Sequence, residues 1–215
     1  MKTRVGILIS GRGSNMMALV EAAQAPDYPA EIAVVISSNP TAPGLAWAQQ
    51  RGLPTVALHH KAYPSREAFD DAVHAELVKA RVDLVALAGF MRIQSGAFVR
   101  RWAGRQLNIH PSLLPLFKGL HPHQQALDAR VKLSGCTVHF VTEEMDSGPI
   151  VAQAAVPVLE GDTADTLSKR ILVAEHKLYP HALALVARGQ ATAEGGGVTL
   201  SATEDPAAQL FSPQL

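Results

Sequence analysis

The sequence predicts an α/β fold: a Rossmann-like, mostly parallel twisted sheet with helices on both faces, followed by an antiparallel strand pair and a long helix. The main observation is a set of short, continuous apolar runs, which are typical of parallel strands buried on both faces. These runs cover residues 5–10, 32–37, 54–58 and 83–89. Helical patterns lie between them, as the crossover connections of a parallel sheet require. We therefore expect residues 1–110 to form a doubly wound half.

The three helices that we expect between these strands cover residues 14–25, 43–51 and 65–80. The third has the clearest pattern, because Phe69, Val73 and Leu77 recur at a spacing of four and so line one helix face. Ser65 precedes them and belongs to the residue types that cap helix N-termini.

The pattern changes after residue 130. Residues 136–141 and 150–158 alternate more clearly and are separated by the loop TEEMDSGP, so they predict an antiparallel strand pair. A long helix is expected over residues 163–188, because apolar residues such as Leu167 and Ile171 recur on one face.

These elements predict one domain over residues 1–190, with an N-terminal half (1–110) and a C-terminal half (111–190). Residues 191–215 contain a glycine triplet and scattered polar residues. We expect a C-terminal extension there, with one short strand and then a loose tail.

The charge balance argues against two classes of partner. Basic and acidic residues number 19 each, so no basic excess points to nucleic acid or to an anionic membrane. The single cysteine, Cys136, cannot form an internal disulfide and reads as a small buried residue. The N-terminal apolar run is too short for a signal peptide or a membrane span, so we expect a cytoplasmic protein.

A glycine-containing loop, SGRGSN at residues 10–15, joins the first expected strand to the first expected helix. Backbone N–H groups at such a helix start bind anions. Gly11 and Gly13 match the first two glycines of a dinucleotide fingerprint, but Met16 stands where the third belongs. The loop therefore favours a single phosphate or a phosphoribosyl group. A tight turn without a ligand is the alternative.

Three polar residues are expected at the carboxyl edge of the sheet, where open α/β sheets bind ligands. Asn108 and His110 lie two positions apart in LNIHPSLLP, so both point the same way on a strand, and Asp146 lies in the later loop. An amide suits a developing oxyanion, a histidine moves protons near neutral pH, and a carboxylate orients the histidine. Together they suit acyl transfer to a nucleophile that the substrate brings. Taken singly, each is more typical of a structural residue. Ser112 lies nearby, between prolines that leave a triad geometry open.

Five stretches resemble the formyltransferase family. They are GRGSN (11–15), LAGFMRI (87–93), LNIHPSLLP (107–115), GCTVHFV (135–141) and DSGPI (146–150). HPSLLP and DSGP are similar to the wider family, whereas GRGSN and the Glu-His pair of the long helix narrow the resemblance to the folate-dependent phosphoribosylglycinamide formyltransferases. The similarity runs in order from residue 4 to about residue 188.

This resemblance implies roles for individual residues. Asn108, His110 and Asp146 match the catalytic three of the family. The implied phosphate- and ribose-binding residues are Gly13, Ser14, Asn15 and Glu175. The implied folate-binding residues are Arg66, Met91, Arg92, Ile93, Gln94, Val99, Asn108, Thr142, Glu143, Glu144, Met145 and Asp146. Gln94 departs from the family, which more commonly has an apolar residue there.

The resemblance also implies a reaction and its partners. A formyl group would pass from 10-formyltetrahydrofolate, a cosubstrate, to the amine of N1-(5-phospho-D-ribosyl)glycinamide in purine biosynthesis, by direct attack through a tetrahedral intermediate. No metal is implied, and the partners are small molecules rather than nucleic acid or membrane. A monomer or a homodimer is expected.

Two other readings remain open. A methionyl-tRNA formyltransferase or a formyltetrahydrofolate hydrolase would be expected to carry a further domain. A non-catalytic nucleotide-binding module would need the loop at 11–15 but not Asn108, His110 and Asp146.

Overall fold

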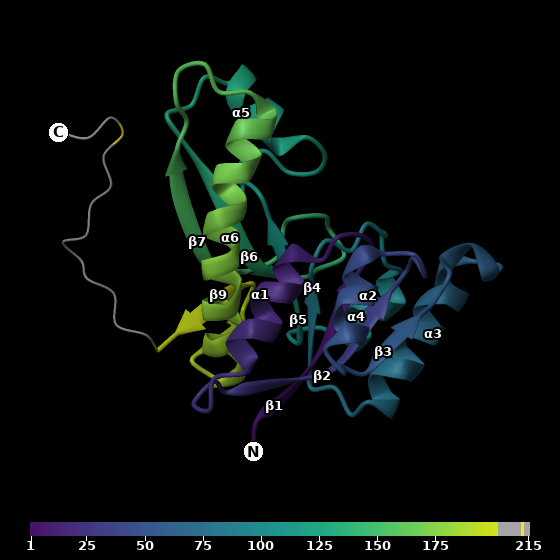
Figure 1. Ribbon diagram of the computed structural model, residues 1–215. Coiled ribbons are helices and arrows are strands. Elements are labelled where there is room, and N and C mark those ends of the chain that lie inside the picture. Colours follow the sequence, from purple (N-terminus) through teal and green to yellow (C-terminus); the bar gives the residue numbers. More distant parts are fainter. Residues whose placement is uncertain (202–211, 213–215) are drawn as a thin grey trace.

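The computed structural model describes residues 1–201 and residue 212. A seven-stranded sheet forms its centre (Figure 1). Its strands are β1 (Thr3–Ile9), β2 (Ala30–Ser37), β3 (Thr55–Ala57), β4 (Leu84–Leu87), β5 (Gln106–His110), β6 (Leu133–Phe140) and β7 (Ile150–Pro157). The strand order is β3-β2-β1-β4-β5-β6-β7. Strands β1 to β5 pair in parallel, whereas β6 pairs antiparallel with both β5 and β7. The predicted fold class and the predicted antiparallel pair are confirmed.

Helices cover both faces of this sheet. They are α1 (Ser14–Ala23), α2 (Pro43–Gln50), α3 (Arg66–Lys79), α4 (Gly96–Arg101), α5 (Pro122–Asp128) and α6 (Ala164–Ala187), with a short 3-10 helix, η1 (His60–Ala62). Two apolar layers result. Met16 of α1 and Ile171 of α6 belong to the layer on one face, and Phe69 of α3 and Phe98 of α4 to the layer on the other. Strand β1 contributes to both layers, because Ile7 belongs to the first layer and the next residue, Leu8, belongs to the other.

The two best-patterned helices begin at side-chain caps, of which the sequence predicted the one at Ser65. The Ser65 side chain accepts a hydrogen bond from the Ala68 N–H at 3.1 Å, immediately before α3. Thr163 and Thr166 form a reciprocal capping box before α6. Because each cap satisfies N–H groups that the first helical turn leaves free, the starts of both helices are fixed locally.

Helix α4 and the arrangement of the extension were not predicted. Helix α4 has six residues, and the Ser95 side chain caps it by accepting from the Phe98 N–H at 3.3 Å. The extension contains two strands, β8 (Ala191–Glu194) and β9 (Gly197–Leu200), where the sequence predicted one. The glycine turn between them has positive φ angles, which explains why the hairpin can close there. The predicted loose tail lies outside the described residues, and the division at residue 190 stays a prediction.

Candidate active site

The strand β5 carries Asn108 and His110 at the junction of the parallel and antiparallel parts of the sheet. In the register of β5 and β6, Asn108 lies opposite His139 and His110 opposite Thr137. His110 is almost fully buried, while Asn108 keeps partial exposure. The two side chains point to the same side because they are two positions apart on one strand.

Asp146 reaches this strand end from the loop between β6 and β7. Its Oδ2 lies 3.4 Å from His110 Nδ1 and accepts a hydrogen bond from the Gly119 N–H at 2.9 Å. Asp146 has a φ of 49°, a left-handed conformation that Asp and Asn tolerate better than most residues. The backbone of this loop thus turns the carboxylate inward.

His110 has an acceptor at each ring nitrogen. Nε2 lies 2.9 Å from the carbonyl oxygen of Phe117, and Nδ1 faces the Asp146 carboxylate. A doubly protonated imidazole can donate to both groups, whereas either neutral tautomer leaves one acceptor without a proton. The arrangement therefore suits an imidazolium beside the partly exposed Asn108 amide.

A network of hydrogen bonds holds the loop that follows β5. The Thr137 hydroxyl donates to the Ser112 carbonyl at 2.7 Å and accepts from the Leu114 N–H at 3.0 Å. The Ser112 hydroxyl is fully buried and donates to the Leu116 carbonyl at 2.6 Å. Ser112 therefore serves the loop that presents Phe117, and its geometry does not support a nucleophilic triad with His110.

The glycine loop and α6 form a second polar cluster. Gly13 has a φ of 71° immediately before α1, and the carbonyl of Gly11 accepts from the Gly44 N–H at 3.1 Å. Asn15, in the first turn of α1, donates through Nδ2 to Glu175 Oε2 at 2.6 Å. Glu175 is only 6% exposed. Burial raises the pKa of its carboxyl, and the Asn15 bond opposes that rise.

The segments expected to hold folate lie on the exposed side of the same edge. Met91, Ile93 and Met145 are 77%, 65% and 55% exposed. The Met91 N–H donates to the Ser10 hydroxyl at 2.9 Å, which fixes the segment after β4 to the end of β1. Arg100 pairs with Glu143 at 2.7 Å and so links α4 to the loop between β6 and β7. These contacts join the two segments around one open surface.

The other residues expected to bind folate differ in how exposed they are. Gln94 accepts a hydrogen bond from the side chain of the buried Gln106. Val99 is buried in α4, and Arg66 is exposed in the first turn of α3 beside Glu67. The remaining residues are exposed, namely Arg92, Thr142, Glu143 and Glu144. All of these assignments stay predictions.

Comparison with known proteins decides the family. The family model described as formyl transferase matches residues 3–183. The chain belongs to the formyl transferase family.

Relatives agree with this assignment. The trifunctional purine biosynthetic protein adenosine-3 of Bos taurus is 52% identical over 204 residues, covering 95% of this chain and 20% of that protein. The phosphoribosylglycinamide formyltransferase of Escherichia coli K12 is 45% identical over 184 residues, covering 86% of this chain and 87% of that protein. A glycinamide ribonucleotide transformylase 1 from Symbiobacterium toebii matches with a TM-score of 0.90 and 48% identity, covering 93% of this chain and 94% of that one. This formyl transferase thus spans about a fifth of the trifunctional relative.

His139 is a residue of this formyl transferase site that sequence reasoning missed. Its Nδ1 lies 2.9 Å from the Phe140 carbonyl, and its Nε2 lies 3.4 Å from Asn108 Nδ2 and 3.8 Å from Asp146 Oδ1. Burial lowers the pKa of His139, while the Phe140 carbonyl and Asp146 oppose that change and His110 adds to it. A neutral ring that donates from Nδ1 can accept from the Asn108 amide at Nε2. The one available signal was the pairing of β6 with β5, which places His139 opposite Asn108.

In residues 1–201 and 212, which the structure describes, no group of three or more His, Cys, Asp or Glu residues could hold a metal ion. No helix in that part of the chain is long and apolar enough to cross a membrane.

Proposed function

We propose that this formyl transferase transfers the formyl group of 10-formyltetrahydrofolate to the amine of N1-(5-phospho-D-ribosyl)glycinamide, a step of purine biosynthesis. The observation that carries the proposal is that one sheet edge holds both polar clusters. Asn108, His110 and Asp146 form one, and the glycine loop with Glu175 forms the other. The names of the E. coli and S. toebii relatives support the same substrate.

The reaction needs no nucleophile from the protein. An amine of this type has a pKa near 8, so a useful fraction is neutral at neutral pH. Its nitrogen attacks the formyl carbon, and the carbonyl π electrons move to oxygen as the tetrahedral intermediate forms. Asn108 Nδ2 would donate to that oxyanion, and the positive charge of the His110 imidazolium would stabilise it electrostatically. Collapse of the intermediate breaks the bond to the folate nitrogen, which gains a proton as the attacking nitrogen loses one.

Asp146 and His139 would position these donors. The Asp146 carboxylate at 3.4 Å stabilises a charged His110. His139, held by the Phe140 carbonyl, fixes the direction in which the Asn108 amide points. The chemistry thus rests on donors arranged before the substrate arrives.

The second cluster would bind the ribonucleotide. The N–H groups of Gly13, Ser14 and Asn15 lie at the start of α1, where the helix dipole favours a phosphate. The buried Glu175 carboxylate would accept from the glycinamide part of the substrate. Two substrates held in line gain rate from orientation alone.

The pterin would lie against the exposed apolar surface of Met91, Ile93 and Met145. The backbone of residues 91–94 and 142–146 would supply the hydrogen bonds to the pterin. For these residues, the position of the backbone would therefore matter more for binding than the identity of the side chain. We also propose, from the sequence, a cytoplasmic protein that is a monomer or a homodimer.

A spectrophotometric assay tests this function. Loss of the formyl group from 10-formyltetrahydrofolate is followed by absorbance, with and without the ribonucleotide. Turnover that requires the ribonucleotide supports the proposal, turnover without it indicates a hydrolase, and binding without turnover indicates a nucleotide-binding module. Asn108→Ala should lower turnover by about 10²- to 10³-fold, the usual cost of one oxyanion donor. Turnover unchanged by that substitution would exclude this role for Asn108.

A further inference from the structure

The segment between β4 and α4, residues 90–95, has no regular secondary structure but is attached to one helix at both ends. At its start, the Phe90 ring stacks on Phe69 of α3, with ring centroids 6.5 Å apart and an interplanar angle of 13°. At its end, the Ser95 N–H donates to Oδ2 of Asp70, the next residue of α3, at 2.6 Å. Neighbouring residues of one helical turn thus hold the two ends of the segment together.

Between these ends, two further hydrogen bonds attach the segment to the sheet. The Met91 N–H donates to the Ser10 hydroxyl at 2.9 Å, and the Gln94 side chain accepts from the Gln106 side chain. Of the three hydrogen bonds that hold the segment, the one to Asp70 has a charged acceptor. An irregular segment depends on such bonds for its conformation, because it has no ladder of helix or sheet bonds.

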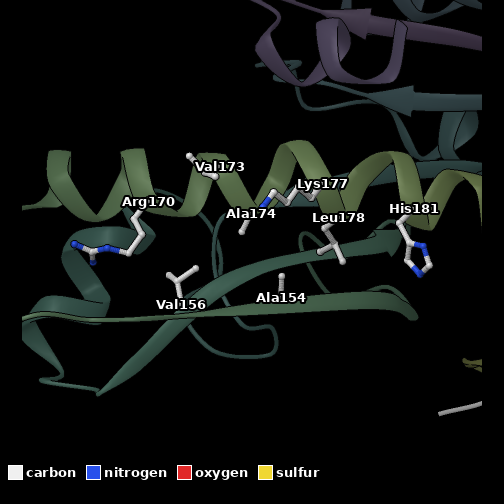
Figure 2. A pocket seen from close by; sticks show the side chains of 8 residues that line it. All are labelled: Ala154, Val156, Arg170, Val173, Ala174, Lys177, Leu178 and His181. Atoms are coloured by element: carbon white, nitrogen blue, oxygen red, sulfur yellow. The ribbon is translucent and has the colours of Figure 1, made fainter. Parts of the chain in front are cut away.

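Asp70 is unusual because it is a carboxylate inside the protein. Charged side chains usually keep contact with water. Those that line the apolar groove between β7 and α6 do so, since the Arg170 side chain is 26% exposed and Lys177 is exposed as well (Figure 2). Asp70 is only 3% exposed. Burying a carboxylate costs free energy unless hydrogen bonds or opposite charges compensate for the lost water.

Hydrogen bonds from Ser95 supply most of this compensation. Arg66, one turn earlier in α3, pairs with Glu67 at 3.6 Å. Burial raises the pKa of the Asp70 carboxyl, and the hydrogen bonds from Ser95 oppose this rise more than the charge of Arg66 does. Because a hydrogen bond to an ionised acceptor is stronger than one between neutral groups, Asp70 links α3 firmly to Ser95.

Ser95 passes this link on to α4 and to the second segment expected to face the pterin. Its side chain caps α4 by accepting from the Phe98 N–H at 3.3 Å. In the same helix, Arg100 pairs with Glu143 of the loop between β6 and β7 at 2.7 Å. The position of α4 therefore affects both segments around the open surface.

We propose that Asp70 is a positioning residue for the folate: its buried carboxylate holds Ser95, and through it residues 91–94, in the conformation that binds the pterin. This inference rests on the function proposed above, in which the backbone of residues 91–94 binds the pterin. Asp70 is too deeply buried to touch the folate itself. It would increase affinity by fixing the backbone before the folate arrives, which removes a cost of ordering on binding.

Three variants of the full-length protein test this role. Asp70→Ala removes the acceptor of the Ser95 N–H, whereas Asp70→Asn keeps a neutral amide oxygen that can accept from it. Asp71→Asn is the matched control, because Asp71 also joins α3 to α4, through Arg101, but its side chain is 63% exposed. Isothermal titration calorimetry measures the Kd of tetrahydrofolate, the deformylated product, and the Kd of the ribonucleotide, so the test does not depend on turnover.

We expect Asp70→Ala to raise the Kd of tetrahydrofolate by about tenfold or more, the usual cost of losing a hydrogen bond to a charged group. Asp70→Asn should raise it less, by roughly threefold, because a neutral acceptor is weaker. Asp71→Asn should leave it nearly unchanged, because exposed ion pairs contribute little. The Kd of the ribonucleotide should stay the same in all three variants. Hydrogen exchange of a peptide covering residues 90–95 should become faster in the Asp70 variants alone.

A purely structural role for Asp70 would give a different result. It would lower the melting temperature and the number of binding sites in the titration, but the remaining sites would keep the wild-type Kd of tetrahydrofolate. That outcome, or an equal rise in the Kd of both ligands, would overturn the positioning role and leave the proposed function intact. If Asp70→Ala does not fold, the same comparison is decided by Asp70→Asn. A wild-type protein that does not bind tetrahydrofolate would overturn the proposed function and this inference with it.

Discussion

Replacing Asp146 by Asn removes the charge next to His110 and keeps the shape of the site. The left-handed backbone at this position suits Asn as well as Asp, so the loop should keep its conformation. The amide oxygen can still accept from the Gly119 N–H, which the carboxylate binds at 2.9 Å. The substitution therefore isolates the electrostatic contribution of one carboxylate.

The size of the effect follows from the 3.4 Å separation of His110 Nδ1 and Asp146 Oδ2. Two unit charges at that distance attract by about 5 kcal/mol at an effective dielectric constant of about 20. Removing one partner of a buried ion pair costs about 3–5 kcal/mol, which agrees with this value. A loss of that size in the charged transition state lowers kcat by at least on the order of 10²-fold.

Steady-state kinetics of Asp146→Asn measure this effect directly. We expect a lower kcat with KM for the ribonucleotide nearly unchanged, because the glycine loop and Glu175, which we propose to bind the ribonucleotide, form a separate cluster. Asp165→Asn is the matched control, since Asp165 pairs with Lys169 on an exposed turn of α6. A kcat for Asp146→Asn within about threefold of the wild type would refute the electrostatic role that we assign to the carboxylate.

Three further substitutions probe other parts of the structure. His139→Phe should lower kcat by about tenfold, the worth of one oriented hydrogen bond, with an unchanged ribonucleotide KM; a matching rise in KM would instead indicate a collapsed site. Because burial raises the carboxyl pKa of Glu175, the native state holds its proton more tightly than the unfolded chain, and this residue costs stability as the pH rises above the ordinary value of 4.5. In urea unfolding, the free energy of unfolding of Glu175→Gln relative to the wild type should therefore be higher at pH 7 than at pH 4. An equal difference at the two pH values would contradict a raised pKa of Glu175. Tyr179→Phe removes a buried hydroxyl 3.0 and 3.1 Å from the carbonyls of Leu87 and Leu107, and should cost about 1–3 kcal/mol of unfolding free energy by urea titration; a cost near zero would mean that water replaces the hydroxyl.

The parts of the fold that could be predicted are those with a repeating signal. The parallel strands are buried on both faces, so their sequences are continuous apolar runs. Helix α3 could be predicted from its N-terminal cap and from the regular spacing of its apolar residues. Helix α4 has six residues, too few turns for a periodic pattern to emerge.

The residues of the candidate active site also differ in whether the sequence could predict that they lie together. Asn108 and His110 share one short stretch, so their proximity could be inferred from strand geometry. His139 and Glu175 could not be assigned by such reasoning, because their places depend on strand register and on how α6 packs against α1. Glu175 was predicted only from the resemblance to the formyltransferase family. His139 was predicted neither from that resemblance nor from the sequence pattern.

The bond between Asn15 and Glu175 joins residues that are 160 positions apart in the chain. During synthesis the glycine loop emerges early, and its partner emerges only after the sheet strands have been made. His110 and Asp146 both precede α6 in the chain, whereas the ribonucleotide site that we propose needs Glu175 from that helix. We therefore expect a chain that stops before α6 to lack this proposed site and the proposed activity.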